Sequence, residues 1–258
     1  MRPHMTRVLP RTNFHSSKLI RCLADLALAD AGDSGNAFAE QLGQWVHFAD
    51  AITLSAVHSE GLPRVPTARA EVQAAARTAV ADEAERIQAF LVNSVRRSFS
   101  PKLGRTHIQL PIPELALPMN VGTAYAPYRR FYESHQRDME LSIQPLRTNV
   151  REALAKASPR LRKLAELDVT LEKILRDREG KLLARVPLLL RKRFEQLFKE
   201  HQQKLADSAQ ADNPAAWAQA GGWLARFCDD MQMLLLAEVE LRLQPTLGLI
   251  EAFKQDTQ

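Results

Sequence analysis

Apolar residues recur every three or four positions along most of this chain, and that period constrains its fold more than any other feature. The clearest run lies within 128–154, where one helix face would carry Tyr128, Phe131, Tyr132, His135, Met139, Ile143, Leu146, Val150 and Leu154. Glycine, which weakens helices, accounts for only 10 of the 258 residues. The sequence therefore predicts an all-α protein of six to seven helices, and rods of about 40 Å imply an elongated bundle.

The N-terminal half is predicted to contain a tail, three helices and an extended segment. Residues 1–12 are expected to be a disordered tail, followed by an N-terminal helical part over 13–98. Its helices are expected from a cap at Ser16 or Ser17 to about Asp30, over about 36–58 and over about 67–98. Four prolines then fall within 99–126, and its HIQLPIPEL stretch alternates apolar and polar residues. This range therefore predicts an ordered, Pro-rich extended crossover.

The C-terminal part, 127–258, predicts a bundle of long antiparallel helices in which coiled-coil pairing is open. Pro127 can open the first helix at its first position, and Pro145 is expected to kink it. Further starts, bends or interruptions are predicted at Ser158–Pro159, Gly180, Pro187, Asn213–Pro214 and Pro245. The helix after Pro159 should bury Leu161, Leu164, Leu167, Leu171, Ile174 and Leu175, and the last helix Trp217, Leu224, Phe227, Met231, Leu234 and Leu235. We expect both helical parts to form one continuous domain.

Charge is distributed unevenly along the chain. Residues 147–204 hold 16 Lys and Arg against 8 Asp and Glu, a net charge of +8, whereas 205–258 hold 3 against 8, a net charge of −5. Basic side chains on one face would form a ridge that binds phosphates. The candidate nucleic-acid contacts are Arg129, Arg130, Arg160, Arg162, Lys163, Arg191, Lys192 and Arg193. Alternatively, interleaved acidic residues pair with these cations along solvated faces, or the acidic last helix does so, within one chain or a dimer.

The stretch AYAPYRRFYESHQRDM, residues 124–139, illustrates both alternatives. On a helical wheel its aromatic residues fall on the apolar face, and Arg129 and Arg130 lie beside that face. The tyrosines are therefore expected in the core, where Tyr128 and Tyr132 need partners for their hydroxyl groups. His135 is expected to be a buried, hydrogen-bonded histidine rather than a metal ligand or a base. The open alternative adds Arg129 and Arg130 to the basic ridge.

No catalytic or cofactor-binding constellation is evident. The sequence contains no GxGxxG, GxxxxGK[ST], HExxH or GxSxG motif. Cys22 and Cys228 lie far apart without metal-binding spacing, which is typical of free thiols in a reducing compartment. No apolar run reaches the roughly 18–20 residues that span a bilayer, and no secretory signal is evident. We therefore expect a cytoplasmic protein that is not an enzyme and carries no metal or cofactor.

One polar feature in the predicted second helix suggests a docking site. Asp50 and Ser55 fall among apolar residues in QWVHFADAITLSAV, close to Trp45. Burying a carboxylate there is costly unless it is paired or hydrogen-bonded. The partner of Asp50 is either an arginine or a capped helix end of this chain, or a second protein that docks on Trp45, Asp50 and Ser55.

Five segments, taken in order, resemble one bacterial family. They are QWVHFADAITLSAV (44–57), YAPYRRFY (125–132), QRDMELSIQPLR (136–147), ALAKASPRLRKLAELDVTLEKIL (153–175) and REGKLLARVPLLLRKRFEQL (178–197). Over about residues 12–205 the chain resembles the family called domain of unknown function 3348, and the acidic last helix lies outside this resemblance. The resemblance brings no catalytic residues. It implies a cytoplasmic accessory protein beside a flagellar-stator-like membrane motor and an OmpA-like peptidoglycan-binding subunit, similar to the F-type component of type III Zorya anti-phage defence systems.

Two functions follow from these features. The first is a non-enzymatic helical adaptor that docks on the cytoplasmic tail of the motor protein or on a sister accessory protein. The alternative is a DNA-binding sensor or effector subunit that uses the basic segment 147–204. Self-association into a homo-oligomer is open with either function, and we expect no membrane insertion.

Overall fold

The computed structural model describes residues 17–26, 53–55, 70–100, 106–113, 119–208 and 211–256. Its elements are α1 (Lys18–Asp25), α4 (Ala70–Phe99), α5 (Val121–Ala157), α6 (Pro159–Leu183), α7 (Val186–Ser208), the 3₁₀ turn η3 (Pro214–Ala216) and α8 (Trp223–Gln255). Residues 53–55 are also helical, while the predicted tail and most of the predicted helix 36–58 lie outside the described residues. Within the described ranges no strand occurs, which confirms the all-α class.

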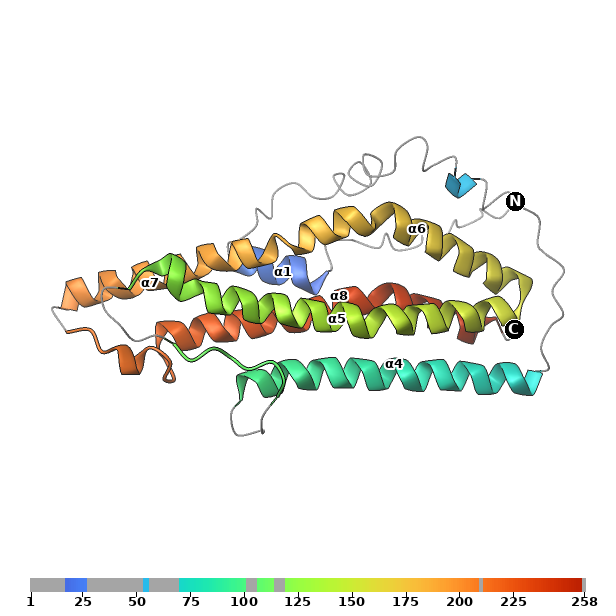
Figure 1. Ribbon diagram of the computed structural model, residues 1–258, viewed down its shortest axis with the longest axis horizontal. Helices are drawn as coiled ribbons and strands as arrows, with labels where there is room; N and C mark the ends of the chain where they lie inside the picture. Colours follow the sequence, from blue (N-terminus) through green and yellow to red (C-terminus); the bar gives the residue numbers. More distant parts are fainter. Residues whose placement is uncertain are drawn as a thin grey trace, which may run out of the picture.

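The long helices lie side by side along the longest axis of the molecule (Figure 1). α4 runs antiparallel to α5. After α5 the chain returns along the bundle through α6 and then α7, and α8 again runs parallel to α5. α5 has 37 residues and α8 has 33, so both are rods of about 50 Å or slightly more. The predicted elongated bundle of long antiparallel helices is confirmed.

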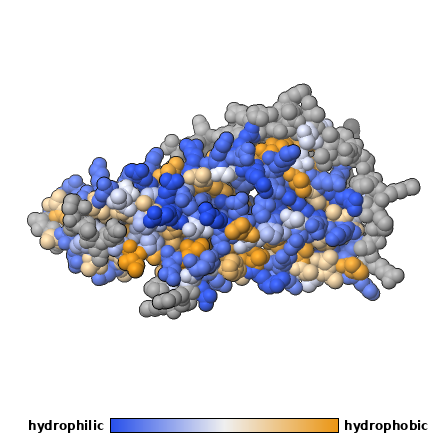
Figure 2. All heavy atoms as spheres, viewed as in Figure 1, coloured by the Kyte–Doolittle hydropathy of each residue, from blue (hydrophilic) through white to orange (hydrophobic). Residues whose placement is uncertain are grey.

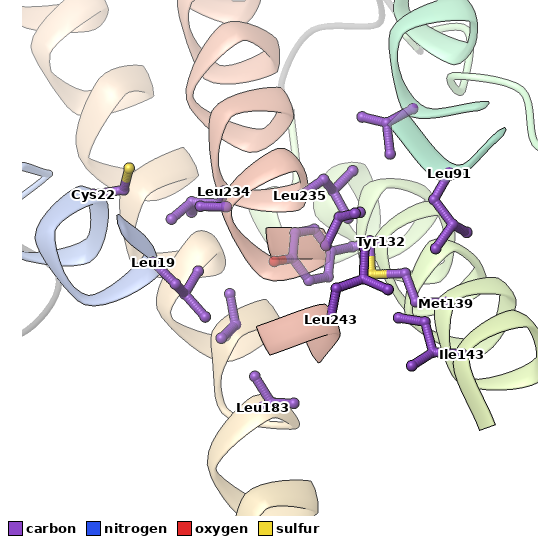
Figure 3. Packing of buried hydrophobic residues seen from close by; sticks show 14 of the residues in the cluster. Leu19, Cys22, Leu91, Tyr132, Met139, Ile143, Leu183, Leu234, Leu235 and Leu243 are labelled. Carbon is purple, nitrogen blue, oxygen red and sulfur yellow. The ribbon is translucent and has the colours of Figure 1, made fainter. Parts of the chain in front are cut away.

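α8 lies at the centre of the bundle and packs against each of the other five described helices. Its predicted apolar residues Leu224, Phe227, Met231, Leu234 and Leu235 are all buried. Leu234 points toward α1, whereas Leu235 and Leu243 point toward α5 (Figure 3). Because α8 is covered on several sides, apolar residues surround much of its circumference, and the described helices share one hydrophobic core.

The predicted apolar face of 128–154 forms the buried side of α5. Every member of it is buried, and Tyr125, one turn earlier, joins it. Tyr128 packs edge-on against Phe227 of α8, with 5.5 Å between ring centroids. Phe194 of α7 contacts the same Phe227 ring at 5.0 Å. These perpendicular ring contacts connect α5, α7 and α8 at one end of the bundle.

α5 begins earlier than the sequence predicts, so the predicted start at Pro127 is wrong. The helix starts at Val121, where the side chain of Asn120 accepts hydrogen bonds from the N–H groups of Gly122 and Thr123 at 2.9 and 3.2 Å. This cap satisfies donors that a helix end otherwise leaves unpaired. Pro127 lies inside the helix and removes one backbone hydrogen bond, while burial of Tyr125 stabilises the added turns.

Three other predicted boundaries shift. α6 continues through Gly180 and ends at Leu183, and Pro187 is the second residue of α7. Asn213 and Pro214 open only the short turn η3, whereas α8 begins at Trp223. Gly221 explains this late start because its φ of 87° favours glycine and reverses the chain before the helix. Pro145 and Pro245 lie inside α5 and α8 and end neither helix.

α6 buries less of its apolar face than its sequence predicts. Of the six predicted core positions, only the first is buried, and the others are half-buried or exposed: Leu161, Leu164, Leu167, Leu171, Ile174 and Leu175. Leu171 has an exposed fraction of 38%. The physical reason is that α6 faces α5 with a different, charged set of residues.

Residues 106–113 of the predicted crossover are extended, and they are joined to α4 by a hydrogen bond. The hydroxyl of Ser98 donates to the carbonyl oxygen of Ile108 at 2.9 Å, and the side chain of Ile108 is buried. Ile112 has an exposed fraction of 91%. Residues 121–126, which the prediction included in the crossover, are instead the first turns of α5.

Both cysteines are free thiols. Cys22 is buried and Cys228 is half-buried, and burial raises the pKa of Cys228 to about 12. In the part of the chain that the structure describes, no helix combines the length and apolar character needed to cross a membrane.

Asn120 provides a direct test of the revised start of α5. Asn120→Ala removes both capping hydrogen bonds and should lower the free energy of unfolding by about 1 kcal/mol, whereas Asn120→Ser should retain most of it. Urea unfolding followed by circular dichroism measures both variants. A helix that began at Pro127 would leave Asn120→Ala without effect.

Candidate functional site

Two arginines of α5 and two carboxylates of α6 form a charged interface between these helices. Arg147 donates to the two oxygens of Asp168 at 2.9 and 2.6 Å. Arg151 donates to Asp168 at 2.7 Å and pairs with Glu172 at 2.6 Å. All four side chains are only 12–13% exposed. Part of the basic segment is therefore neutralised by acidic residues of the same segment, across a helix interface.

Glu172 is held ionised by this interface. Burial by itself raises the pKa of a carboxyl group, but hydrogen bonds from Gln144 and Arg151 outweigh it and lower the pKa of Glu172 to about 2. Gln144 donates from α5 at 2.7 Å. A carboxylate that stays ionised and fully engaged is suited to fixing the register of two helices and poorly suited to accepting a proton.

Two of the predicted nucleic-acid contacts are engaged within the bundle. The side chain of Arg193 is 8% exposed and donates to Asp230 of α8 at 2.8 Å. Arg162 donates to the backbone carbonyl of Ala155 at 3.1 Å, where α5 ends. The pair of Arg193 and Asp230 joins the basic segment to the acidic last helix within one chain, as one of the sequence-based alternatives proposes.

Four more of the predicted contacts lie near the start of α5 and the first turns of α7. Arg129 pairs with Glu133 at 2.7 Å, and Arg191 pairs with Glu195 at 2.9 Å, each one turn along its own helix. The hydroxyl of Tyr125 donates to the backbone carbonyl of Pro187, and these two residues lie one turn before Arg129 and Arg191, so the two helix segments that carry both arginines lie side by side. The neighbouring side chains Arg130 and Lys192 are exposed.

The last two predicted contacts lie at the opposite end of α5. Arg160 is exposed and Lys163 is half-buried in the first turns of α6. Almost the full length of α5 separates them from Arg130, a distance of roughly 40 Å along the helix axis. The fold therefore brings Arg129 and Arg191 together but does not bring them to Arg160.

The predicted docking site on the second helix lies mainly outside the described residues. Trp45 and Asp50 both lie outside the described residues. Ser55 belongs to the described helical residues 53–55 and is exposed.

The most enclosed charge in the described part of the chain was not predicted: Glu238 has an exposed fraction of 0%. Its carboxylate accepts hydrogen bonds from the hydroxyl of Tyr132 at 2.8 Å and from the amide of Gln136 at 3.0 Å. Arg242 donates to the same carboxylate at 2.8 Å from one turn along α8. Burial and then the charge of Glu238 raise the pKa of Tyr132, which keeps its hydroxyl protonated as a donor. The available signal was Glu238 and Arg242 four residues apart inside the apolar run MQMLLLAEVELRL.

A cavity of about 350 Å³ opens beside this buried carboxylate. Its walls come from α5, α6 and α8 and include Gln136, Met139, Gly180, Leu183 and Arg242. Gln136 also donates to the backbone carbonyl of Leu183 at 3.1 Å, so it connects the cluster around Glu238 to the last turn of α6. In the described ranges, no three His, Cys, Asp or Glu side chains are arranged to hold a metal ion.

His135 is buried as predicted, but it is not fully hydrogen-bonded. Its exposed fraction is 1%, and its Nε2 has no hydrogen-bond partner. Burial lowers the pKa of His135 to about 4, and the nearby charge of His107 adds to this effect. His107 approaches Asp138 at 3.5 Å from the extended segment. At neutral pH the ring of His135 is therefore an uncharged part of the core beneath Phe131, with ring centroids 4.8 Å apart.

Glu238 makes a strong prediction for stability. Glu238→Ala leaves Tyr132, Gln136 and Arg242 without their shared acceptor and should lower the free energy of unfolding by about 3–5 kcal/mol. Glu240→Ala is the matched control, because Glu240 lies two residues away on α8 and pairs with Lys18 at a site that is 44% exposed. This control should lose less than about 1 kcal/mol. Equal losses in chemical denaturation would contradict the role of the buried carboxylate.

His135 makes a prediction for the pH dependence of stability. Between its ordinary pKa of 6.5 and the folded value of about 4, the unfolded chain binds a proton that the folded chain does not. Stability should therefore fall as pH drops from 6.5 to 4, by up to about 3 kcal/mol from this group. His135→Gln should flatten that slope in denaturation curves, whereas His107→Gln, at an exposed site, should largely keep it. An unchanged slope in His135→Gln would contradict the assignment.

Comparison with known proteins gives one family. The family model described as Protein of unknown function (DUF3348) matches residues 5–255. No curated protein and no solved structure matches the chain. The matched range extends past the segments that carry the sequence resemblance and includes all of α8. The chain therefore belongs to the DUF3348 family.

Proposed function

We propose that this protein is a non-enzymatic helical adaptor that acts by docking on other proteins. The observation that supports this proposal most is the use of arginines inside the fold. Arg147, Arg151 and Arg193 are engaged by Asp168, Glu172 and Asp230. Cations that are already neutralised contribute little to phosphate binding, so these three arginines of the basic segment serve the bundle itself.

The surface provides a second line of support. Figure 2 shows separate hydrophobic patches over α4, α5 and α6, with hydrophilic residues between them. Individual apolar side chains are exposed on these helices, including Leu141 of α5 at 68% and Phe90 of α4 at 51%. Apolar side chains rimmed by polar residues are typical of surfaces that bind other proteins.

For the cellular setting, we propose an anti-phage defence module with a stator-like membrane motor. The support is the resemblance of the five segments to the F-type component of type III Zorya systems, together with membership of the DUF3348 family. In this proposal the adaptor docks on the cytoplasmic tail of the motor protein or on a sister accessory protein. A rigid bundle of about 50 Å is suited to holding two partners at a fixed separation.

DNA binding is the second candidate function. It is favoured by the basic side chains that remain exposed on α5, α6 and α7, such as Arg130, Arg160 and Lys192. Because these lie in two places roughly 40 Å apart, any DNA would have to follow the length of the bundle. Such binding would depend steeply on salt concentration.

Two experiments, co-purification and phage challenge, test the proposed adaptor function. The chain should be captured by the motor protein or by the sister accessory protein when these are co-expressed, and its removal should abolish protection in plaque assays. Fluorescence anisotropy with a random duplex and a single strand at about 50–200 mM salt forms the second arm. Tight, salt-sensitive DNA binding without capture by either protein would reverse the order of the two candidates. In the DNA-binding measurement, the double variant Arg130→Glu with Lys192→Glu is compared with the control variant Glu133→Gln.

A further inference from the structure

Four apolar residues of α6 follow a seven-residue repeat, and the described helices leave them half-buried or exposed. Leu164, Leu167, Leu171 and Ile174 are separated by three, four and three residues, the spacing of the contact positions in a coiled coil. Leu164 borders the hydrophobic core, but Leu167 and Ile174 are half-buried and lie outside it, and Leu171 is 38% exposed. We call these four residues the α6 seam.

The orientation of α6 explains why the α6 seam is left at the surface. α6 turns Leu161, Ala165, Asp168 and Glu172 toward the rest of the bundle, and the last two of these make the ion pairs with α5. At 3.6 residues per turn, the α6 seam lies about 100° around the helix from this set. The ion pairs therefore fix α6 in a rotation that presents its leucines sideways. An α6 held by apolar packing alone would turn the leucines inward.

Both ends of the α6 seam carry cations. One repeat position before Leu164 is Arg160, and the positions that follow Ile174 are Arg178 and Lys181. Arg160 and Lys181 are exposed, and the rise of the helix places them about 30 Å apart. This pattern is an apolar centre with a positive charge at each end.

A cavity continues the α6 seam at its Arg160 end. It has a volume of about 500 Å³ and lies between the first turns of α6 and the last turn of α8. It is lined by Arg160, Leu161, Lys163, Leu164, Leu167, Ala252, Gln255 and Asp256. The carboxylate of Asp256 is engaged by the hydroxyl of Ser158 at 2.7 Å. An apolar side chain of a docked helix would fit between these three leucines and Ala252, with basic residues at the rim.

We propose that the α6 seam binds one amphipathic helix of a partner protein, with apolar heptad positions at its centre and acidic residues toward both ends. The proposal rests on the adaptor function and names the surface and the chemistry of its partner. A second copy of α6 does not fit: an antiparallel pair would bring Arg160 against Lys181, and a parallel pair would bring Arg160 against Arg160. Nucleic acid does not fit either, because the centre of the α6 seam is apolar.

Two synthetic peptides probe the charge pattern. The first is a fluorescein-labelled helix of about 22 residues with Leu at the central heptad positions and Glu in the terminal turns, and the second has Lys in place of Glu. Anisotropy with the full chain at roughly 100 mM salt should show saturable binding of the Glu peptide, at least about tenfold tighter than the Lys peptide. Equal affinity for the two peptides, or no saturation with the Glu peptide, would overturn the proposal.

Variants locate the binding surface. Leu171→Glu should weaken binding of the Glu peptide by about tenfold or more. Val169→Glu is the matched control, because Val169 is 49% exposed on another face of the same helix, and its binding should be unchanged. The double variant Arg160→Glu with Lys181→Glu should reverse the preference to the Lys peptide. Thermal unfolding by circular dichroism confirms that each variant is folded, and equal losses in Leu171→Glu and Val169→Glu would refute the assignment.

Capture by the motor or sister protein separates this proposal from the adaptor function. If wild-type chain is captured and Leu171→Glu is not, both stand. If the wild-type chain and Leu171→Glu are captured equally, the adaptor function stands and the assignment of the α6 seam as the docking surface is wrong. If neither protein captures the chain but the Glu peptide discriminates as predicted, the α6 seam is a helix-binding surface and the proposed module is wrong. A dimer in analytical ultracentrifugation that Leu171→Glu dissolves would replace the acidic partner with a second copy and overturn the proposal.

Discussion

Glu238 places a carboxylate in the middle of α8, in the most enclosed part of the described core, and the surrounding helices are positioned to satisfy it. Leucine surfaces can pack in several alignments of similar energy, because apolar contacts have little directionality. Hydrogen bonds from Tyr132 and Gln136 have defined geometry, so they select one alignment of α5 against α8. Through the second hydrogen bond of Gln136, to Leu183, the same cluster fixes where α6 ends.

α5 is bound to its neighbours by two different kinds of contact. Toward α8 and α7 it presents aromatic and aliphatic side chains, as in the packing of Tyr128 against Phe227. Toward α6 it presents Arg147 and Arg151, which donate to carboxylates in an interface where these side chains are largely buried. Arginine suits this role because its planar donors match both oxygens of a carboxylate. The result is that two arginines of the basic segment orient α6, and much of the apolar face of α6 is left half-buried or exposed.

Much of the fold could be predicted because it depends on local periodicity. The apolar face of 128–154 and the core residues of α8 follow a helical period, and a buried face needs no other information. The start of α5 was missed because Pro127 is typical of a first helical turn, while the cap at Asn120 lies among other turn-forming residues. The rotation of α6 and the partners of Glu238 depend on which helices meet. Apart from Arg242, which lies one turn from Glu238 on α8, the residues that make those contacts are 17 to 106 positions apart in the chain, and no local pattern encodes them.

The central position of α8 has a consequence for how the molecule is made. α8 is the last of the described helices, yet α1, α4, α5, α6 and α7 all pack against it. Synthesis on the ribosome proceeds from the N-terminus, so α4, α5, α6 and α7 emerge before the surface that covers their apolar faces exists. Until α8 leaves the exit tunnel, Phe194 and Tyr128 lack their shared ring contact with Phe227. The nascent protein therefore completes this core only after α8 has emerged, and its hydrophobic faces need protection from aggregation up to that moment.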